Sequence, residues 1–99
     1  MFKNLSQMKR NLKVGMKYKI IENAIKPQNN GVVRVIEKIQ SNGVKASGVR
    51  LYWQKARNMR FNNDNTIDFL LGEEMKDDWL IEQQANEGKD YWLKIEIIG

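Results

Sequence analysis

The chain has 99 residues, a formal net charge of +5 and an ordinary globular composition, with 41% hydrophobic and 29% charged residues. A chain of this length builds one modest hydrophobic core, so we expect a single domain over residues 1–99. It contains no cysteine and no histidine, which excludes disulfides, thiolate nucleophiles, the commonest metal ligands and the usual general base. We therefore expect a protein that is not an enzyme and that uses no cofactor or metal.

The net charge hides an uneven distribution along the chain. Residues 1–61 hold 14 Lys and Arg against 2 Asp and Glu, a balance of +12, whereas residues 62–99 hold 3 Lys against 10 Asp and Glu, a balance of −7. No apolar run approaches the roughly 18 residues of a membrane span, and the N-terminus lacks the continuous apolar segment of a signal peptide. These features predict a cytoplasmic protein with no membrane partner.

Residues 2–12 are expected to form an N-terminal helix. Phe2, Leu5, Met8 and Leu12 follow one another at spacings of three, three and four, which places them on one helical stripe. Gly15 follows and is suited to ending the segment. The stripe indicates a helix that docks onto a sheet or barrel, with a functional arm as the alternative.

Residues 14–71 carry the pattern of barrel strands. Residues 17–20 alternate polar and apolar side chains, residues 25–31 are typical of a loop, and residues 32–39 are rich in β-branched side chains. Residues 41–43 (Ser-Asn-Gly) predict a tight turn, and a return strand follows from Val44 to Trp53. Gly48 lies in the middle of that strand and predicts a bulge or a sharp bend.

A second hairpin and an acidic C-terminal segment follow. Residues 59–61 and 66–71 flank four consecutive Asn and Asp residues, which predicts a hairpin with its turn at 62–65. Residues 73–99 form an acidic segment that ends in a strand over residues 91–98, with Leu93, Ile95 and Ile97 on one face.

The middle of the acidic segment is harder to assign. We expect a short helical stretch near residues 73–78 and then two strands joined around residues 85–90. The alternative is a longer helix, because Met75 and Trp79 have helical spacing and Gly88 is suited to a helix C-terminus.

Together these elements predict a mainly β fold. The form expected is a small antiparallel SH3-like barrel or a strongly bent sheet with a short N-terminal helix; an OB-like or other α+β sheet is the runner-up. The stretch from Val14 to Ala46 resembles the opening of many SH3-like barrels of the KOW type, in which a glycine precedes the first strand and a polar loop ending in glycine precedes the second. Here these glycines are Gly15 and Gly31. The resemblance implies a small barrel.

A second resemblance concerns residues 75–82, Met-Lys-Asp-Asp-Trp-Leu-Ile-Glu. This segment resembles the acidic segment near the end of several small proteins encoded by phages and mobile elements. Such families include inhibitors of bacterial defence systems, so the resemblance implies an accessory role that acts through a host protein.

Basic residues with aromatic residues among them follow the predicted strands. Lys and Arg neutralise phosphates and flat rings stack on bases, which is the chemistry of a single-strand binder. On the strand over residues 32–39, Arg34 and Lys38 share a face with Ile36, opposite Val33 and Val35. The candidate nucleic-acid-binding residues are Lys17, Lys19, Arg34, Lys38, Arg50, Tyr52, Lys55, Arg57 and Arg60. The alternative is a solvated basic surface with its rings in the core.

The aromatic residues divide between core and surface. Tyr52 and Trp53 are neighbours on a strand and must point to opposite sides. We expect Trp53 to join Leu51 and Val49 in the core and Tyr52 to face a binding partner. Of the three Trp residues, two are expected to anchor the core, and an exposed one would mark an interface.

The acidic run defines the alternative site, which consists of Glu73, Glu74, Asp77, Asp78 and Trp79. Paired carboxylates can hold Mg²⁺ or act as acid and base, but no neighbouring residues supply the rest of such a site. A solvated surface is the simplest interpretation. The patch could also mimic nucleic acid toward a protein partner, or pair with the basic part of a second copy.

We therefore expect a non-enzymatic domain that binds nucleic acid, DNA or RNA, through a basic face with aromatic stacking. The alternative is a small phage-type inhibitor or adaptor, a counter-defence protein that binds a host protein. A homo-oligomer that holds a small ligand between subunits is a third hypothesis. The charge distribution leaves open whether the acidic C-terminal third covers the basic strands.

Overall fold

The computed structural model describes residues 2–72 and 79–99. Strands in these residues form one antiparallel sheet in the order β4-β3-β2-β1-β7-β6-β5. They are β1 (Lys17–Asn23), β2 (Val33–Gln40), β3 (Gly43–Ala46), β4 (Val49–Tyr52), β5 (Met59–Phe61), β6 (Thr66–Leu70) and β7 (Tyr91–Ile98). The helices described are α1 (Leu5–Asn11) and α2 (Trp79–Asn86), with short 3-10 turns η1 (Pro27–Asn29) and η2 (Ala56–Asn58).

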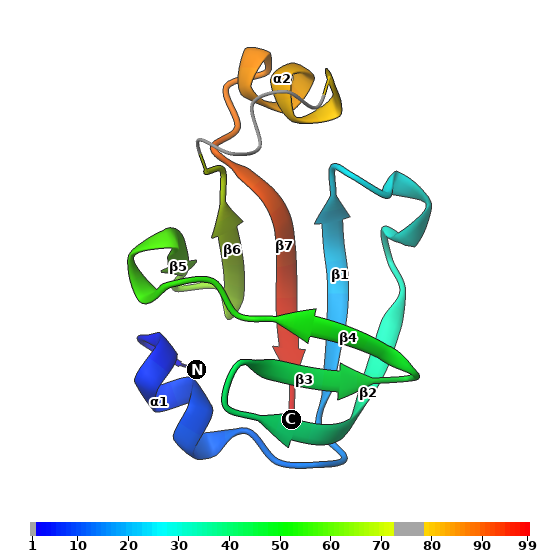
Figure 1. Cartoon of the computed structure of the whole chain (residues 1–99), viewed down its shortest axis with the longest axis vertical. Coiled ribbons are helices and arrows are strands. Elements are labelled where there is room, and N and C mark those ends of the chain that lie inside the picture. The colour runs from blue at the N-terminus through cyan, green and yellow to red at the C-terminus, as the bar shows by residue number, and fades with distance from the viewer. Residues whose placement is uncertain (1, 73–78) are drawn as a thin grey trace.

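The sheet bends along β2, so that the β3–β4 hairpin lies across β1 and β7 (Figure 1). The pairing of β2 with β3 shifts between Ile36 and Lys38, an irregularity of the kind that bends a strand. Strands β4 and β5 stand at the two ends of the strand order, so the described sheet is not closed. The expectation of a mainly β chain with a short N-terminal helix is confirmed, in the form of a strongly bent sheet.

Buried side chains from both halves of the bend meet in one core. Val44 of the hairpin belongs to the same buried cluster as Phe69 and Ile95 of β6 and β7. The Phe69 ring lies between two Trp rings, with its centroid 6.4 Å from that of Trp53 and 5.8 Å from that of Trp92. Each such side chain stabilises the fold by roughly 1.5–3 kcal/mol when it leaves water. Because Trp53 and Trp92 pack against the core, the expectation for the Trp residues is confirmed.

Helix α1 packs on this core through the predicted stripe. Leu5, Met8 and Leu12 are buried and Phe2 packs against them. Asn4 begins the helix, because its Oδ1 accepts a hydrogen bond from the backbone N–H of Gln7 at 2.7 Å. The docking helix is therefore confirmed, although it is shorter than residues 2–12.

The predicted return strand from Val44 to Trp53 is wrong, because the chain reverses within it. Ser47 and Gly48 have φ angles of 47° and 80°, as in a two-residue hairpin turn, and Ala46 pairs with Val49. Gly48 is thus part of the turn between β3 and β4 and is not a bulge inside one strand.

The first of the two strands predicted to join around residues 85–90 is also wrong, because residues 79–86 form α2. The predicted helical stretch at 73–78 lies outside the described residues. Ile81 and Gln84 of α2 are buried and stand three residues apart on one helical face. Gly88 follows the helix with a φ of 81°, which agrees with the alternative assignment of Gly88 to a helix C-terminus.

The second hairpin and the final strand are confirmed. Arg60 pairs with Asp68 and Phe61 with Ile67 across the turn at 62–65. In β7, Leu93, Ile95 and Ile97 are buried, as predicted. None of the helices in residues 2–72 and 79–99 has the length and apolar character needed to cross a membrane.

Candidate nucleic-acid interface

Basic side chains line up across the outer surface of the β2–β4 strands. Lys38 pairs with Lys45, and Lys45 pairs with Arg50, so the three residues form one row across the sheet. Directly opposite residues of paired strands point to the same side. Tyr52 stands two residues after Arg50 on the same side and is 55% exposed. We call Lys38, Lys45, Arg50 and Tyr52 the hairpin face.

The hairpin face keeps its positive charge. Glu37 is the single acidic residue of β2, β3 and β4, and its carboxylate accepts a hydrogen bond from the backbone N–H of Gly48 at 3.1 Å. The Arg50 Nη1 donates to the neutral amide oxygen of Gln40 at 2.9 Å. Within the described residues, no carboxylate forms an ion pair with Lys38, Lys45 or Arg50. Among the described residues, the row is therefore a set of cations without ion-pair partners.

The prediction that Arg34 and Lys38 share an outer face is wrong. Arg34 pairs with buried Tyr18 and belongs to the inner surface of the bend, while Val33 and Val35 point outward and are exposed. The register shift before Lys38 returns that residue to the outside. Val49 is also partly exposed, which contradicts its predicted place in the core.

Two further predicted residues lie on a different surface. Lys17 and Lys19 alternate with buried Tyr18 and Ile20, so they point away from the core on the outer side of β1. Because the core lies between β1 and the hairpin, this side is opposite the hairpin face. The sequence predicts that Lys17 and Lys19 share a surface with Arg50 and Tyr52. The structure places the two lysines on another surface.

Lys55 and Arg57 extend the basic surface beyond Tyr52. Both are exposed, and they lie in the connection from β4 to β5, at and around η2. The side-chain amide of Gln54 ties this connection to the body, because its Nε2 donates to the Asn58 and Leu70 carbonyl oxygens at 2.7 and 3.2 Å. The connection therefore holds two cations next to the end of β4.

Arg60 is unsuited to binding a phosphate, contrary to the prediction. Its Nε and Nη2 donate to Asp68 Oδ2 at 3.0 and 2.8 Å, and its Nη1 and Nη2 donate to Asp90 at 2.7 and 2.8 Å. Hydrogen bonds to Asp90 and then Asp68 raise the pKa of Arg60. Asp68 is 1% exposed and needs this partner. Arg60 is thus a structural residue.

Glu22, a carboxylate of β1 near β7, also has local partners. Glu22 accepts hydrogen bonds from Lys89, Gln84 and Tyr91 at 2.9, 3.1 and 3.0 Å. Burial alone would raise the pKa of Glu22, but these hydrogen bonds lower it below its ordinary value. Glu22, Asp68 and Asp90 thus have their partners near β5, β6 and β7, and among the described residues no carboxylate forms an ion pair with the hairpin face.

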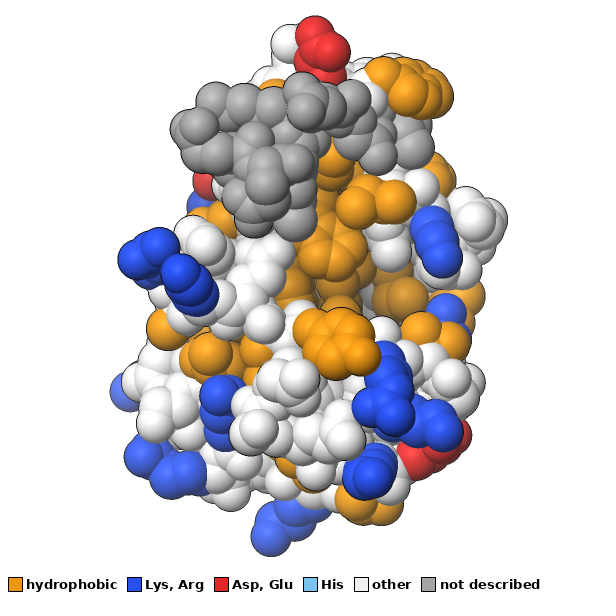
Figure 2. Space-filling model, in the orientation of Figure 1, with side chains coloured by type: hydrophobic (Ala, Val, Ile, Leu, Met, Phe, Trp, Pro, Cys, Tyr) orange, Lys and Arg blue, Asp and Glu red, His pale blue; other side chains and the backbone are white. Residues whose placement is uncertain are grey.

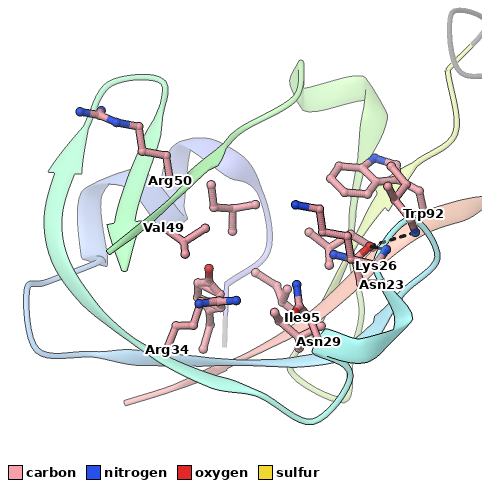
Figure 3. Close-up of a pocket in the computed structure, with 13 residues that line it drawn as sticks. Asn23, Lys26, Asn29, Arg34, Val49, Arg50, Trp92 and Ile95 are labelled. Atoms are coloured by element: carbon pink, nitrogen blue, oxygen red, sulfur yellow. Dashed lines mark hydrogen bonds between the residues drawn. The ribbon is translucent and has the colours of Figure 1, made fainter. Parts of the chain in front are cut away.

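A cavity of about 220 Å³ opens between the two halves of the bend. Its apolar lining includes Ile20, Leu93 and Ile95 from the β1–β7 half and Val49 and Leu51 from β4. Figure 3 shows Arg34 and Val49 on one side, facing Asn23, Lys26 and Asn29 on the other. Figure 2 shows this face of the molecule with an apolar hollow in its middle and Lys and Arg side chains beside it.

Tyr18 has an unusual place at this cavity. Its side chain is 3% exposed and lines the cavity, and no hydrogen bond joins its hydroxyl to another described residue. Burial raises the pKa of Tyr18, and the nearby Arg34 cation opposes that shift. The phenol therefore remains protonated at neutral pH and offers an unused donor beside a guanidinium.

The alternative acidic site falls largely outside the described residues. Glu73, Glu74, Asp77 and Asp78 belong to the part that the structure leaves out. Trp79 begins α2 and is 69% exposed, as expected of a residue at an interface.

Sequence reasoning missed several residues of the interface. Lys45 was missed because Ser47 and Gly48 were not recognised as the β3–β4 turn, which places Lys45 opposite Arg50. Tyr18 has the pattern of a core residue, and only its unpaired hydroxyl distinguishes it. Lys26 and Asn29 lie in a loop, where periodicity carries no signal.

In the described ranges, no group of three or more acidic side chains could hold a metal ion. No family model, curated protein or solved structure matches the chain. Function therefore has to be argued from the hairpin face and the cavity themselves.

Proposed function

We propose that the protein binds single-stranded nucleic acid through the hairpin face and the adjoining connection. The observation that carries this proposal is the row Lys38–Lys45–Arg50, which has no ion pair within the described residues and ends beside exposed Tyr52. Cations spaced across neighbouring strands can follow a phosphate backbone, and a flat exposed ring offers a stacking platform.

A single strand suits this surface better than a duplex. Stacking on Tyr52 requires a base with a free face, and the interior bases of a duplex have none. Arg34 and Lys26 add positive charge at the cavity, next to β4. A strand that crosses the hairpin face therefore meets cations along its backbone and apolar or aromatic surface for its bases.

The test is a salt titration of binding to single-stranded and double-stranded oligonucleotides. For single strands, log Kobs falls with log salt by about 0.7 per phosphate neutralised, so three row cations predict a slope steeper than about −2. Binding to the single strand should be the tighter. Absence of binding to either at low salt would refute the proposal, because electrostatic affinity is greatest there.

Matched variants distinguish this surface from general basicity. The triple variant Lys38→Ala, Lys45→Ala, Arg50→Ala should weaken binding and reduce the salt slope by about 2. The variant Lys17→Ala, Lys19→Ala changes the opposite side of the molecule and should leave affinity nearly unchanged. Equal losses in the two variants would mean that binding depends on net charge alone.

Tyr52 is tested separately. Stacking of one base on an aromatic side chain is worth about 1–3 kcal/mol, so Tyr52→Ala should reduce affinity by about tenfold. The salt slope should stay the same, because no cation is removed.

Exposed Trp79 favours a second candidate function, binding to a host protein as an inhibitor or adaptor. Capture of partners from a bacterial lysate with and without nuclease separates the two functions. Partners lost after nuclease treatment support nucleic-acid binding. Partners that resist nuclease and are lost in Trp79→Ala support the protein-directed function.

A further inference from the structure

The cavity beside the hairpin face has the features of a site for a small ligand. Its volume of about 220 Å³ lies below the range of about 300–1,000 Å³ that holds drug-sized molecules. Apolar side chains from β1, β4 and β7 form most of the lining, which suits a flat ring more than a hydrated ion. A single heterocyclic ring is the appropriate size and character.

The polar groups at the cavity are mainly donors. Tyr18 is 3% exposed and lines the cavity, and its hydroxyl has no hydrogen bond to a described residue. Arg34 forms no ion pair with the described residues. Lys26 supplies an ammonium group on the opposite side (Figure 3). A ligand that brings an acceptor to Tyr18 and Arg34 would give both donors a hydrogen-bonding partner.

We propose that the cavity takes one unstacked base of the bound strand and prefers a base that presents a carbonyl oxygen over one that presents an amino group there. This inference rests on the proposed single-strand binding. Uracil and thymine carry a carbonyl oxygen where cytosine carries an amino group. The cytosine amino group is a hydrogen-bond donor and would therefore face the donors of Tyr18 and Arg34. The hairpin face holds the backbone, and the cavity distinguishes the base.

The cavity and the face are positioned for one strand. Val49, Arg50 and Leu51 of β4 line the cavity, while Arg50 and Tyr52 belong to the hairpin face. In Figure 3, Arg50 stands at the rim and points away from the cavity. A strand whose phosphates contact Arg50 therefore lies within reach of the cavity entrance.

The test compares ten-residue oligo(dU) and oligo(dC), which carry the same backbone charge. Anisotropy titrations at fixed low salt should show oligo(dU) binding about tenfold more tightly, the effect of about one well-made hydrogen bond. In Tyr18→Phe, affinity for oligo(dU) should fall to that of oligo(dC), and affinity for oligo(dC) should stay the same. Arg34→Gln is a second variant, at a partly exposed position, and should reduce the preference in the same direction.

The double variant Lys38→Ala, Lys45→Ala, which leaves every residue that lines the cavity in place, provides the control. It should weaken binding to both oligonucleotides by the same factor and retain the preference for oligo(dU). Equal affinities of the native protein for oligo(dU) and oligo(dC) would overturn the base preference and leave single-strand binding in place. A preference that persists in both Tyr18→Phe and Arg34→Gln would overturn the assignment to this cavity. No binding to either oligonucleotide would overturn both proposals.

Discussion

Arg60 on β5 donates hydrogen bonds to two carboxylates, whereas Arg50 on β4, at the other end of the same strand order, donates to a neutral amide. The contrast extends to their neighbours. Around β5–β7, Arg60, Lys89 and Lys94 each pair with a described carboxylate, while the hairpin face lacks described carboxylate partners. Charge near β7 therefore contributes to stability, whereas the cations of the hairpin face are available for the recognition that we propose.

The largest expected effect tests the paired region. Asp68→Ala should destabilise the protein by about 3 kcal/mol, because it leaves Arg60, Asn62 and Lys94 without their shared, buried carboxylate. Urea denaturation measures the change in the free energy of unfolding. The control Lys45→Ala, on the hairpin face, should change it by less than about 0.5 kcal/mol. Similar losses in both variants would remove the contrast between the two regions.

The next largest effect tests whether close packing of β3 against β4 stabilises the hairpin region. A Cβ added at Gly43 would clash with the Leu51 carbonyl oxygen and would lie 2.9 Å from the Tyr52 Cα. Gly43→Ala should therefore push β4 from β3 and cost about 2 kcal/mol, measured by urea denaturation. Gly99→Ala meets nothing within 4 Å and is the matched control. A neutral Gly43→Ala would show that the two strands can separate freely.

Acid should weaken the paired region selectively. Hydrogen bonds from Arg60 hold the pKa of Asp90 below its ordinary 3.8, and the pKa of Glu22 lies below its ordinary 4.5 because hydrogen bonds outweigh burial. A carboxyl with a lowered pKa in the folded state contributes stability above its unfolded pKa and loses it as the pH falls through the folded pKa. Stability should thus decline below about pH 4, by about 1 kcal/mol for each partly exposed pair.

Glu22→Gln provides the control for this pH dependence. The variant lacks one of the titrating carboxyl groups, so its stability should decline less steeply in acid. Thermal unfolding from pH 7 to pH 3 measures the difference. An identical acid profile would show that Glu22 contributes nothing to it.

The smallest effect concerns two tyrosines. Tyr18→Phe removes a hydroxyl with no hydrogen-bonding partner among the described residues, so stability should change by less than about 0.5 kcal/mol. Tyr91→Phe removes a hydrogen bond of 3.0 Å to Glu22 and should cost about 1 kcal/mol. Urea denaturation of both variants tests the contrast. A larger loss in Tyr18→Phe would mean that its hydroxyl already has a structural partner.

Much of the fold follows from local signals in the sequence. The stripe through Leu5 and Met8 predicts α1, and the Asn- and Asp-rich turn predicts the β5–β6 hairpin. Helix α2 is only the alternative assignment from the sequence, because one of its buried positions holds a polar residue, Gln84, which donates hydrogen bonds to Glu22 and to the Tyr91 carbonyl oxygen. The β3–β4 turn escapes it because Ser47, a residue with no strong preference for positive φ, stands before Gly48.

The candidate site is less predictable because it depends on contacts distant in sequence. The hairpin register opposes Arg60 and Asp68, but Asp90 joins them from 30 residues away. Simple alternation along β2 places Arg34 and Lys38 on the same face, but the register shift between Ile36 and Lys38 puts them on opposite sides of the sheet. The cavity combines residues from β1, β2, β4 and β7, which meet only because the sheet bends.

The open strand order has a consequence for solubility. A sheet that does not close exposes backbone hydrogen-bonding groups along its end strands, and such edges can recruit strands from other copies and start aggregation. Here the end strands β4 and β5 have four and three residues, and each carries an arginine, Arg50 or Arg60. Short, charged edges are poor templates for further strands. Arg50, to which we assign a phosphate contact, thus also helps to keep copies of the protein apart.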